Sequence, residues 1–325
     1  MEKKKVVTIG GGTGSYNLLR GLKKYTDKIE ISAIVTMMDS GGSSGILRDE
    51  YGVLPPGDIR RCLIALSDET EILKKLFNYR FHSKKGNSLS GHNFGNLFLT
   101  ALEKILNSEQ KAIKFASKIL KVRGKVLPVT FQSTHLYARL EDGTLIKGES
   151  VIDLPRSTSN LRIKRLYLKP PAEANPEVLI AIKQAQVIII GPGDLFTSII
   201  PNLVVNGVSK AIRKSKALKI YNCNIMTKYG ETNDFSVYDH LATIEEYIGC
   251  PCIDVLTYNS KKLRSKILKR YQREKAKPVK FIQNEFKSRN IEIIGRNLVT
   301  EPNVARHDPE KIGKLIMKII SKRLS

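Results

Sequence analysis

The chain has 325 residues, of which 41% are hydrophobic, so it can bury a substantial core and is not an intrinsically disordered protein. No apolar run reaches the ~18 residues that a membrane-spanning helix needs, which excludes a membrane span of that kind. The formal net charge of +24 admits a nucleic-acid partner, but lysines occur throughout the chain and no arginine-rich or aromatic-interleaved RNA motif is present. We therefore favour a lysine-rich surface and expect no nucleic-acid partner.

The amino terminus is basic and then apolar, and glycines follow at once from Gly10. We interpret this segment as a first strand rather than a secretory signal, because a long apolar region and a cleavage site are missing. The cysteines form no Cys-x-x-Cys pair and no zinc-ligand spacing: Cys62, Cys223, Cys250 and Cys252. The sequence thus predicts a cytoplasmic protein with reduced thiols and no metal site built from cysteine and histidine.

The chain opens with an alternation of strands and small-residue loops. A β-branched run at 5–9 leads into glycines at 10–14, and a helical pattern of leucines follows. A second strand at 31–36 leads into another loop of small residues at 39–45. The order strand, loop, helix, strand is the start of a parallel α/β sheet.

The middle of the chain changes from a helical to a strand-rich pattern and back. The expected segments are helices in 57–81 and 93–122, strands and hairpins in 125–168, a helix near 176–185 and an apolar strand at 187–190. A basic stretch at 262–280 carries apolar residues at helical spacing, so we expect a helix with a solvated basic face. We predict one α/β domain over residues 1–325, with a β-rich insertion at 125–168.

The first loop has the composition of a phosphate-binding turn. Its residues Gly11, Gly12, Thr13 and Gly14 follow a strand and open a helix, whose amino terminus offers unpaired N–H groups and a positive dipole end. The loop is not a strict dinucleotide fingerprint, because Ser15 stands where a third glycine belongs, and it is not a Walker A loop. The alternative is a glycine turn that only packs a helix on a strand.

The second loop combines an acid with small and hydroxyl residues. Asp39 follows the second strand, where an acid often holds a ribose hydroxyl in doubly wound folds. The following Gly41, Gly42, Ser43 and Ser44 offer hydroxyls and accessible N–H groups that suit phosphate or sugar oxygens. The alternative is a loop that only caps the next helix.

A third loop follows the apolar strand at 187–190. Gly191, Gly193, Asp194 and Thr197 lie where ligands gather in open α/β sheets, at the ends of strands. A magnesium ion held by Asp39 or Asp194 together with a diphosphate is compatible with these residues, although the sequence does not require one.

Two polar helix starts complete the set of candidates. Asp58 is expected to cap a helix, and Arg60 could hold a phosphate through two hydrogen bonds. His92 and Asn93 open an apolar helix, where His92 could act as a base or as a hydrogen-bond donor. The alternatives are a solvated arginine and a structural histidine. No nucleophile–base pair is evident from the sequence, so no catalytic residue is assigned.

Together these segments closely resemble the CofD-like family and, within it, the gluconeogenesis-factor (YvcK) branch. The matching segments are 10–14, 39–45, 55–60, 91–96, 191–202, 226–227, 230–232 and 306–309. The resemblance covers nearly the whole chain in the right order. It implies a Rossmann-like three-layer α/β fold with a mainly parallel sheet.

For this branch the resemblance implies binding of UDP-sugars such as UDP-N-acetylglucosamine. It also implies a role in cell shape, cell-wall integrity and growth on gluconeogenic carbon sources. Tyr271 and Arg306 look similar to positions that the branch places near its nucleotide-sugar. We expect Asp308 to cap the final helix, with Pro309 at its first position, which leaves Arg306 on the connecting loop.

The CofD branch instead implies a transferase that moves phospholactate from a guanosine-diphosphate donor to a deazaflavin with magnesium. This sequence departs from the usual pattern at Met37, Met38, Ser40, Lys228 and Tyr229. Ser40 stands where a second acid beside Asp39 is common, so a two-carboxylate magnesium site is weakened, and with it the transferase interpretation.

We therefore predict a regulatory protein that binds a UDP-sugar and requires no cofactor. A 2-phospho-L-lactate transferase-like enzyme is the alternative. A regulator of this kind acts through a downstream protein partner, and the sequence leaves a homo-oligomer open.

Overall fold

The computed structural model describes residues 2–82, 88–154, 160–300 and 303–324. Its centre is a seven-stranded sheet in the order β10-β9-β8-β7-β1-β2-β3, and every neighbouring pair is parallel. The strands are β1 (Lys4–Gly10), β2 (Ile29–Val35), β3 (Lys125–Pro128), β7 (Val187–Ile190), β8 (Leu218–Asn222), β9 (Val255–Asn259) and β10 (Glu292–Arg296). The predicted parallel α/β fold is confirmed.

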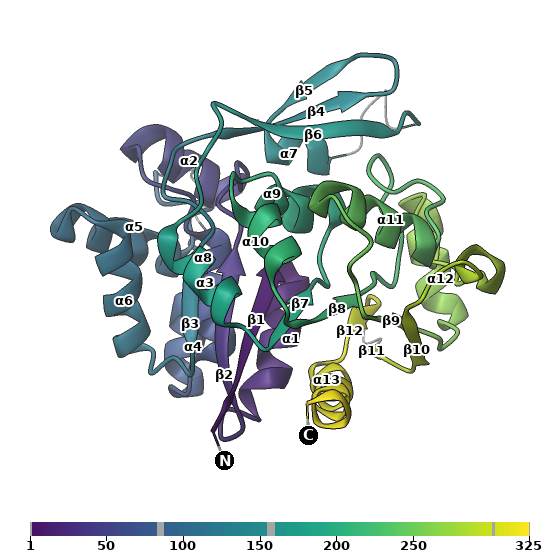
Figure 1. Ribbon diagram of the computed structural model, residues 1–325. Helices are drawn as coiled ribbons and strands as arrows, with labels where there is room; N and C mark the ends of the chain where they lie inside the picture. The colour runs from purple at the N-terminus through teal and green to yellow at the C-terminus, as the bar shows by residue number, and fades with distance from the viewer. Residues whose placement is uncertain (1, 83–87, 155–159, 301–302, 325) are drawn as a thin grey trace.

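Helices cover both faces of this sheet and give three layers (Figure 1). One group contains α1 (Gly12–Lys23), α3 (Gly57–Leu66) and α13 (Pro309–Arg323), with α4 (Glu71–Asn78), α5 (Phe94–Leu106) and α6 (Glu109–Ile119) packed beside α3. The other group contains α8 (Pro176–Gln184), α9 (Ile200–Leu203), α10 (Val208–Lys214) and α11 (Val237–Ile248). Right-handed crossovers explain why the helices divide between the two faces of the sheet. The units β1–α1–β2 and β7–α10–β8 run in opposite directions across the sheet, so their helices lie on opposite faces.

The apolar pattern of the sequence accounts for the core. β7 is apolar at every position and completely buried, as expected for a strand in the middle of a parallel sheet with helices on both faces. Leu18, Leu19 and Leu22 of α1 are also buried, which confirms the helical leucine pattern.

The order of the strands reverses between β1 and β7. From β1 the chain proceeds to β2 and β3 on one side, and from β7 it proceeds to β8, β9 and β10 on the other. Ligands of open α/β sheets bind beyond the carboxyl ends of the strands at such a reversal. The first and third predicted loops follow β1 and β7, so the topology brings them together at this point.

The β-rich insertion lies above the carboxyl edge of the sheet (Figure 1). It is an antiparallel sheet in the order β5-β4-β6, formed by β4 (His135–Leu140), β5 (Leu145–Lys147) and β6 (Ile163–Lys169). A short helix, α7 (Glu149–Asp153), connects β5 to the next segment. The strand at the start of the 125–168 range, β3, pairs with β2 in the main sheet instead, so that range divides between the two sheets.

The remaining elements are two helices, two short helical turns and a two-stranded pair. They are α2 (Gly42–Tyr51), the π-helical turn η1 (Leu195–Ile199), α12 (Ser265–Arg273), the 3₁₀ turn η2 (Gln283–Phe286), and the two-stranded pair β11 (Val299–Thr300) and β12 (Arg306–His307). α13 crosses α1 very closely, since a Cβ on Gly21 would lie 2.0 Å from the carbonyl oxygen of Pro309. Among the residues described, no helix combines the length and apolar character needed to cross a bilayer.

Candidate functional site

Two adjacent cavities lie at the carboxyl edge of the sheet. The first cavity has a volume of about 510 Å³ and the second about 490 Å³. They share the residues Gly12, Thr13, Asp153, Asp194 and Ser198. We call the two together the cleft, and its middle is formed by the first and third loops at the strand-order reversal. A further cavity of about 560 Å³ lies between α6 and α8, and none of the predicted site residues is among the described residues that line it.

The first loop places the amino terminus of α1 at the middle of the cleft. Gly11, Gly12, Thr13 and Gly14 all line the first cavity. Gly14 is required by close packing, because a Cβ there would lie 2.2 Å from the carbonyl oxygen of Pro192 in the third loop. The N–H groups of a first helical turn have no partners within the helix, so this surface attracts anions.

Asp58 supports the first loop, a role that was not predicted. The expected cap is wrong: α3 begins at Gly57 with Pro56 at the N-cap, and Asp58 lies in the first turn. Its carboxylate accepts a hydrogen bond from the backbone N–H of Gly12 and another, of 2.9 Å, from Nη1 of Arg61. Burial raises the pKa of Asp58 above its ordinary value, and Arg61 opposes that shift.

The second loop lines the second cavity through Asp39, Gly41, Gly42, Ser43 and Ser44. Oδ1 of Asp39 accepts a hydrogen bond of 3.0 Å from the N–H of Gly41, which turns the chain into α2. The loop therefore forms an acidic wall with hydroxyl groups beside it.

A carboxylate from the insertion faces this wall. Glu149 of α7 accepts a 3.3 Å hydrogen bond from the N–H of Ser40 and lines the second cavity. Burial, with Asp39 and Asp153 nearby, raises the pKa of Glu149 to about 8. Sequence reasoning missed Glu149, because α7 has only five residues and too few turns to show a helical period.

His92 and Asn93 lie behind the second loop and outside both cavities, so the suggested direct contact with a ligand is not supported by their positions. Nδ1 of His92 is 3.3 Å from Oγ of Ser43, and the N–H of Asn93 donates to the same oxygen at 3.2 Å. Asn93 also caps α5 by accepting from the N–H of Asn96. Both residues are buried and fix the start of α2.

Arg60 lines the second cavity, but its guanidinium is largely engaged by the protein. Nε donates to Oδ1 of Asn96 at 2.9 Å, and Nη1 donates to Oδ1 of Asn78 at 2.7 Å. Burial lowers the pKa of Arg60 to about 10, so the side chain stays charged at neutral pH. Arg60 therefore holds α3, α4 and α5 together through Nε and Nη1, and its contact with a phosphate stays a prediction.

The third loop reaches the cleft through Gly193, Asp194 and Thr197. Gly191 does not line either cavity; its φ of +66° turns the chain at the end of β7. Oγ1 of Thr197 is 3.4 Å from Oδ1 of Asp153, which links η1 to the insertion.

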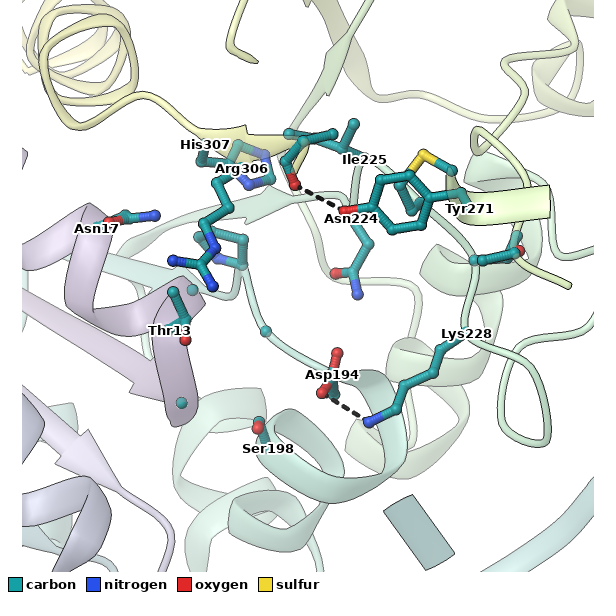
Figure 2. Close-up of a pocket in the computed structure, with 18 of the residues that line it drawn as sticks. Thr13, Asn17, Asp194, Ser198, Asn224, Ile225, Lys228, Tyr271, Arg306 and His307 are labelled. Atoms are coloured by element: carbon teal, nitrogen blue, oxygen red, sulfur yellow. Dashed lines mark hydrogen bonds and ion pairs between the residues drawn. The ribbon is translucent and has the colours of Figure 1, made fainter. Parts of the chain in front are cut away.

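The far end of the first cavity carries Tyr271 and Arg306, which Figure 2 shows on either side of Asn224. Tyr271 is half-buried on α12, and its hydroxyl lies 3.4 Å from the carbonyl oxygen of Ala305. Arg306 is exposed, and its guanidinium points toward Thr13 (Figure 2). Arg306 lies on β12, paired with Thr300, rather than on a free loop, while the predicted cap of α13 by Asp308 is confirmed.

The loop after β8 supplies side chains that sequence reasoning left without a role. Asn224, Met226, Thr227 and Lys228 all line the first cavity. Nζ of Lys228 contacts Asp153, Asp194 and Glu231, and these three acids are a group of described residues close enough to hold a metal ion. Burial opposes protonation of Lys228, but the three carboxylates raise its pKa above the ordinary value.

Glu231 is the buried member of this group, with 2% of its surface exposed. Burial raises its pKa to about 7, and Lys228 opposes the shift. The sequence signal for this loop was its place among the segments of the family resemblance, which gave no function to Lys228.

Comparison with known proteins supports the resemblance. A family model described as "2-phospho-L-lactate transferase CofD" matches residues 6–299 of the chain. The chain belongs to the CofD family.

Within this family the chain is similar to proteins named gluconeogenesis factors. A putative gluconeogenesis factor of Aquifex aeolicus is 44% identical over 328 residues, covering 100% of this chain and 99% of the relative. The gluconeogenesis factor of Bacillus subtilis is 43% identical and covers 98% of this chain and 99% of its own. A crystal structure of a Bacillus halodurans protein superposes with a TM-score of 0.92 at 42% identity, covering 97% of this chain and 100% of the other.

Proposed function

We propose that the cleft binds a nucleoside-diphosphate sugar, a UDP-sugar, and that the protein responds to it as a regulator. The single observation that carries this proposal is the position of Gly12 and Thr13, at the amino terminus of α1 and at the junction of the two cavities. A diphosphate at that junction would meet the positive end of the helix dipole and N–H groups of the first turn other than that of Gly12, which donates to Asp58. Each cavity has a volume within the range of about 300–1,000 Å³ that is typical of ligand sites.

The two ends of the cleft differ in chemistry, and this gives the ligand a direction. Tyr271 offers a flat ring for a base, and Arg306 offers a charged fork for a phosphate or a uracil carbonyl. Asp39 and the hydroxyl of Ser44 offer partners for sugar hydroxyls at the other end. The nucleoside would therefore lie in the first cavity and the sugar in the second.

The proposed role is regulatory rather than catalytic. Ser43 has a histidine neighbour, but its oxygen already accepts from the N–H of Asn93 and from Nδ2 of Asn96, both at 3.2 Å. A hydroxyl in this network is held in place and is poorly disposed to attack a substrate. We infer that UDP-sugar binding controls growth on gluconeogenic carbon sources, which the relatives' name gluconeogenesis factor supports. We extend the proposal to cell shape and cell-wall integrity on the family resemblance alone.

The second candidate is a phospholactate-type transferase, favoured by the description of the matching family model. In that case a magnesium ion with a diphosphate-linked donor would be held by carboxylates of the cleft such as Asp39 or Asp194.

Calorimetric titration with UDP-sugars, UDP, GDP and a dinucleotide, each with and without magnesium, tests the proposal. We expect saturable binding of a UDP-sugar and an unchanged ligand after hours of incubation. Release of nucleotide, or transfer of phospholactate to a deazaflavin, would establish the enzyme instead. Binding of GDP with no binding of any UDP-sugar would contradict the proposed ligand.

A further inference from the structure

Lys228 lies at the meeting point of three segments that are distant in sequence. Figure 2 shows one of its ion pairs, with Asp194. Its Nζ is 2.9 Å from Oδ2 of Asp194, in the third loop, and 2.9 Å from Oε1 of Glu231, on its own loop. It also forms an ion pair with Asp153 at the end of α7 in the insertion. One ammonium therefore holds together the main sheet, the loop after β8 and the insertion.

Without a cation, this arrangement of acids would be unfavourable. Oxygen atoms of the three carboxylates all lie within 4.8 Å of one another. Like charges at this separation repel strongly where water is partly excluded. Oxygen ligands of this kind and number are also what a hard divalent cation such as Mg²⁺, Mn²⁺ or Ca²⁺ binds.

Glu231 shows that the group is built to receive a cation. The residue is 2% exposed, and its Oε1 faces Lys228 without a well-aligned hydrogen bond from any described residue. Its other oxygen, Oε2, accepts from the backbone N–H of Phe196 at 3.3 Å, which fixes the direction of the carboxylate. A buried acceptor held in this way requires positive charge in front of it.

We propose that Lys228 is a built-in cation that occupies a divalent-metal site formed by Asp153, Asp194 and Glu231. Two consequences follow. The wild-type protein does not bind a metal at this position, and loss of the ammonium opens the position to a divalent ion. Since Asp153 and Asp194 border both cavities, the cleft also takes its anionic ligand without a metal, and this last step rests on the proposed function.

A salt-bridge network with no relation to metal chemistry is the competing explanation. In that case the ammonium only fastens the insertion to the main sheet, and the three carboxylates would separate when it is removed. The two explanations differ in what happens to added metal, so a metal titration decides between them.

The first experiment uses Mn²⁺ as the probe, followed by electron paramagnetic resonance above neutral pH. We expect no saturable Mn²⁺ site in the wild type or in Lys228→Arg, which keeps the positive charge. Lys228→Met should bind one Mn²⁺ per chain, at least about tenfold more tightly than any residual, non-saturable Mn²⁺ binding by the wild type. The double variant Lys228→Met with Glu231→Gln should lose that site.

Stability provides a second measurement on the same proteins. Mn²⁺ should raise the melting temperature of Lys228→Met and leave that of the wild type unchanged, because only a folded-state ligand stabilises. If Lys228→Met does not fold, Lys228→Gln keeps a donor beside Asp194 and replaces it in both measurements. Tight Mn²⁺ binding by the wild type that Asp194→Asn abolishes, or no gain in a folded Lys228 variant, would overturn the proposal.

The final experiment tests whether the positive charge of Lys228 contributes to binding of the UDP-sugar. Wild-type affinity for a UDP-sugar should be the same in chelator and in Mg²⁺, whereas Lys228→Met should lose at least about tenfold in chelator and regain it with Mn²⁺. If the wild type binds no UDP-sugar, the proposed function fails, and the Mn²⁺ titration still decides the role of Lys228. If the wild type loses its affinity for the UDP-sugar in chelator, the claim that the cleft binds its ligand without a metal is wrong.

Discussion

Gly12 combines a backbone requirement with a position in the cleft. Its φ is +62°, a conformation that residues with a Cβ adopt only at a cost. It also borders both cavities at the start of α1. A single substitution at Gly12 therefore mixes a folding effect with a binding effect, and the two must be separated by a matched control.

Gly12→Ala should weaken UDP-sugar binding by at least about 1.4 kcal/mol, a factor of ten, because the new Cβ enters the space for the diphosphate. The control is Gly52→Ala, which has the same φ of +62°, open space around it and no place in the cleft. Both variants should lose about 1–2 kcal/mol of stability from backbone strain. Equal ligand affinities of the two variants in calorimetry would remove the first loop from the site.

Arg306→Ala should weaken UDP-sugar binding by about 1.5–3 kcal/mol, the range for hydrogen bonds to charged groups. The melting temperature of the free protein should barely change, since Arg306 is exposed and β12 pairs through its backbone. Arg296→Ala, an exposed arginine outside both cavities, is the matched control and should bind normally. If the free Arg306 variant is strongly destabilised, or binds as well as the control, Arg306 has a structural role only.

At the scale of elements, the sequence predicted the fold and the middle of the cleft well. The loops after β1, β2 and β7 were identified from glycine, acid and hydroxyl residues that follow apolar strands. Parallel strands end at the same edge of a sheet, so residues that are far apart in sequence were expected to meet there. The structure brings Thr13, Asp39 and Asp194 to the lining of one cavity.

The contacts made by helices and by the insertion could not be predicted in this way. A strand pattern at 125–128 does not reveal which sheet the strand joins, and β3 joined the main sheet. His92 and Arg60 carry reactive or charged groups, yet each also contacts side chains from other elements, which no local sequence pattern indicates. The ion pairs of Lys228 connect residues up to 75 positions apart, and no local pattern indicates them.

Glu149 of α7 contacts the second loop, and this contact should make the stability of the protein depend on pH. The pKa of Glu149 is raised to about 8 in the folded protein, mainly by burial, above the ordinary value of 4.5. A carboxyl with a raised folded pKa binds its proton more tightly in the folded state. Its contribution to stability is therefore complete below about pH 4.5 and is lost as the pH rises through about 8.

Glu149→Gln should remove this contribution. Between about pH 5 and pH 8 the wild type should lose about 1–2 kcal/mol of stability relative to the variant, a reduced value because Glu149 keeps part of its surface in water. Denaturant unfolding of both proteins across this range measures the difference directly. Glu71→Gln, at an exposed position of α4, is the control. Its free energy of unfolding should change with pH in the same way as that of the wild type. A difference that stays constant with pH would show that Glu149 is ionised throughout.

At the scale of the whole molecule, the net charge of +24 is the property that most invites another function. The densest basic run surrounds α12, whose apolar residue Ile267 is buried while Lys266, Lys269 and Arg270 are exposed. This is the predicted amphipathic helix with a solvated basic face. Its exposed lysines and arginines attract any polyanion, but attraction of this kind carries no sequence preference.

We therefore expect duplex DNA and RNA to bind weakly, with a Kd of about 10⁻⁴–10⁻⁶ M at physiological salt, and with an affinity that falls steeply as salt is added. Anisotropy titrations with several unrelated sequences at two or more salt concentrations measure both properties. Replacing Lys266 and Lys269 by alanine should weaken all sequences alike and reduce the salt dependence, because each contact to a phosphate releases counterions. UDP-sugar affinity should be unaffected, since neither lysine lines the cleft. A nanomolar complex with one sequence that survives physiological salt would mean that base contacts exist, and the positive charge would then belong to a nucleic-acid site rather than to a solvated surface.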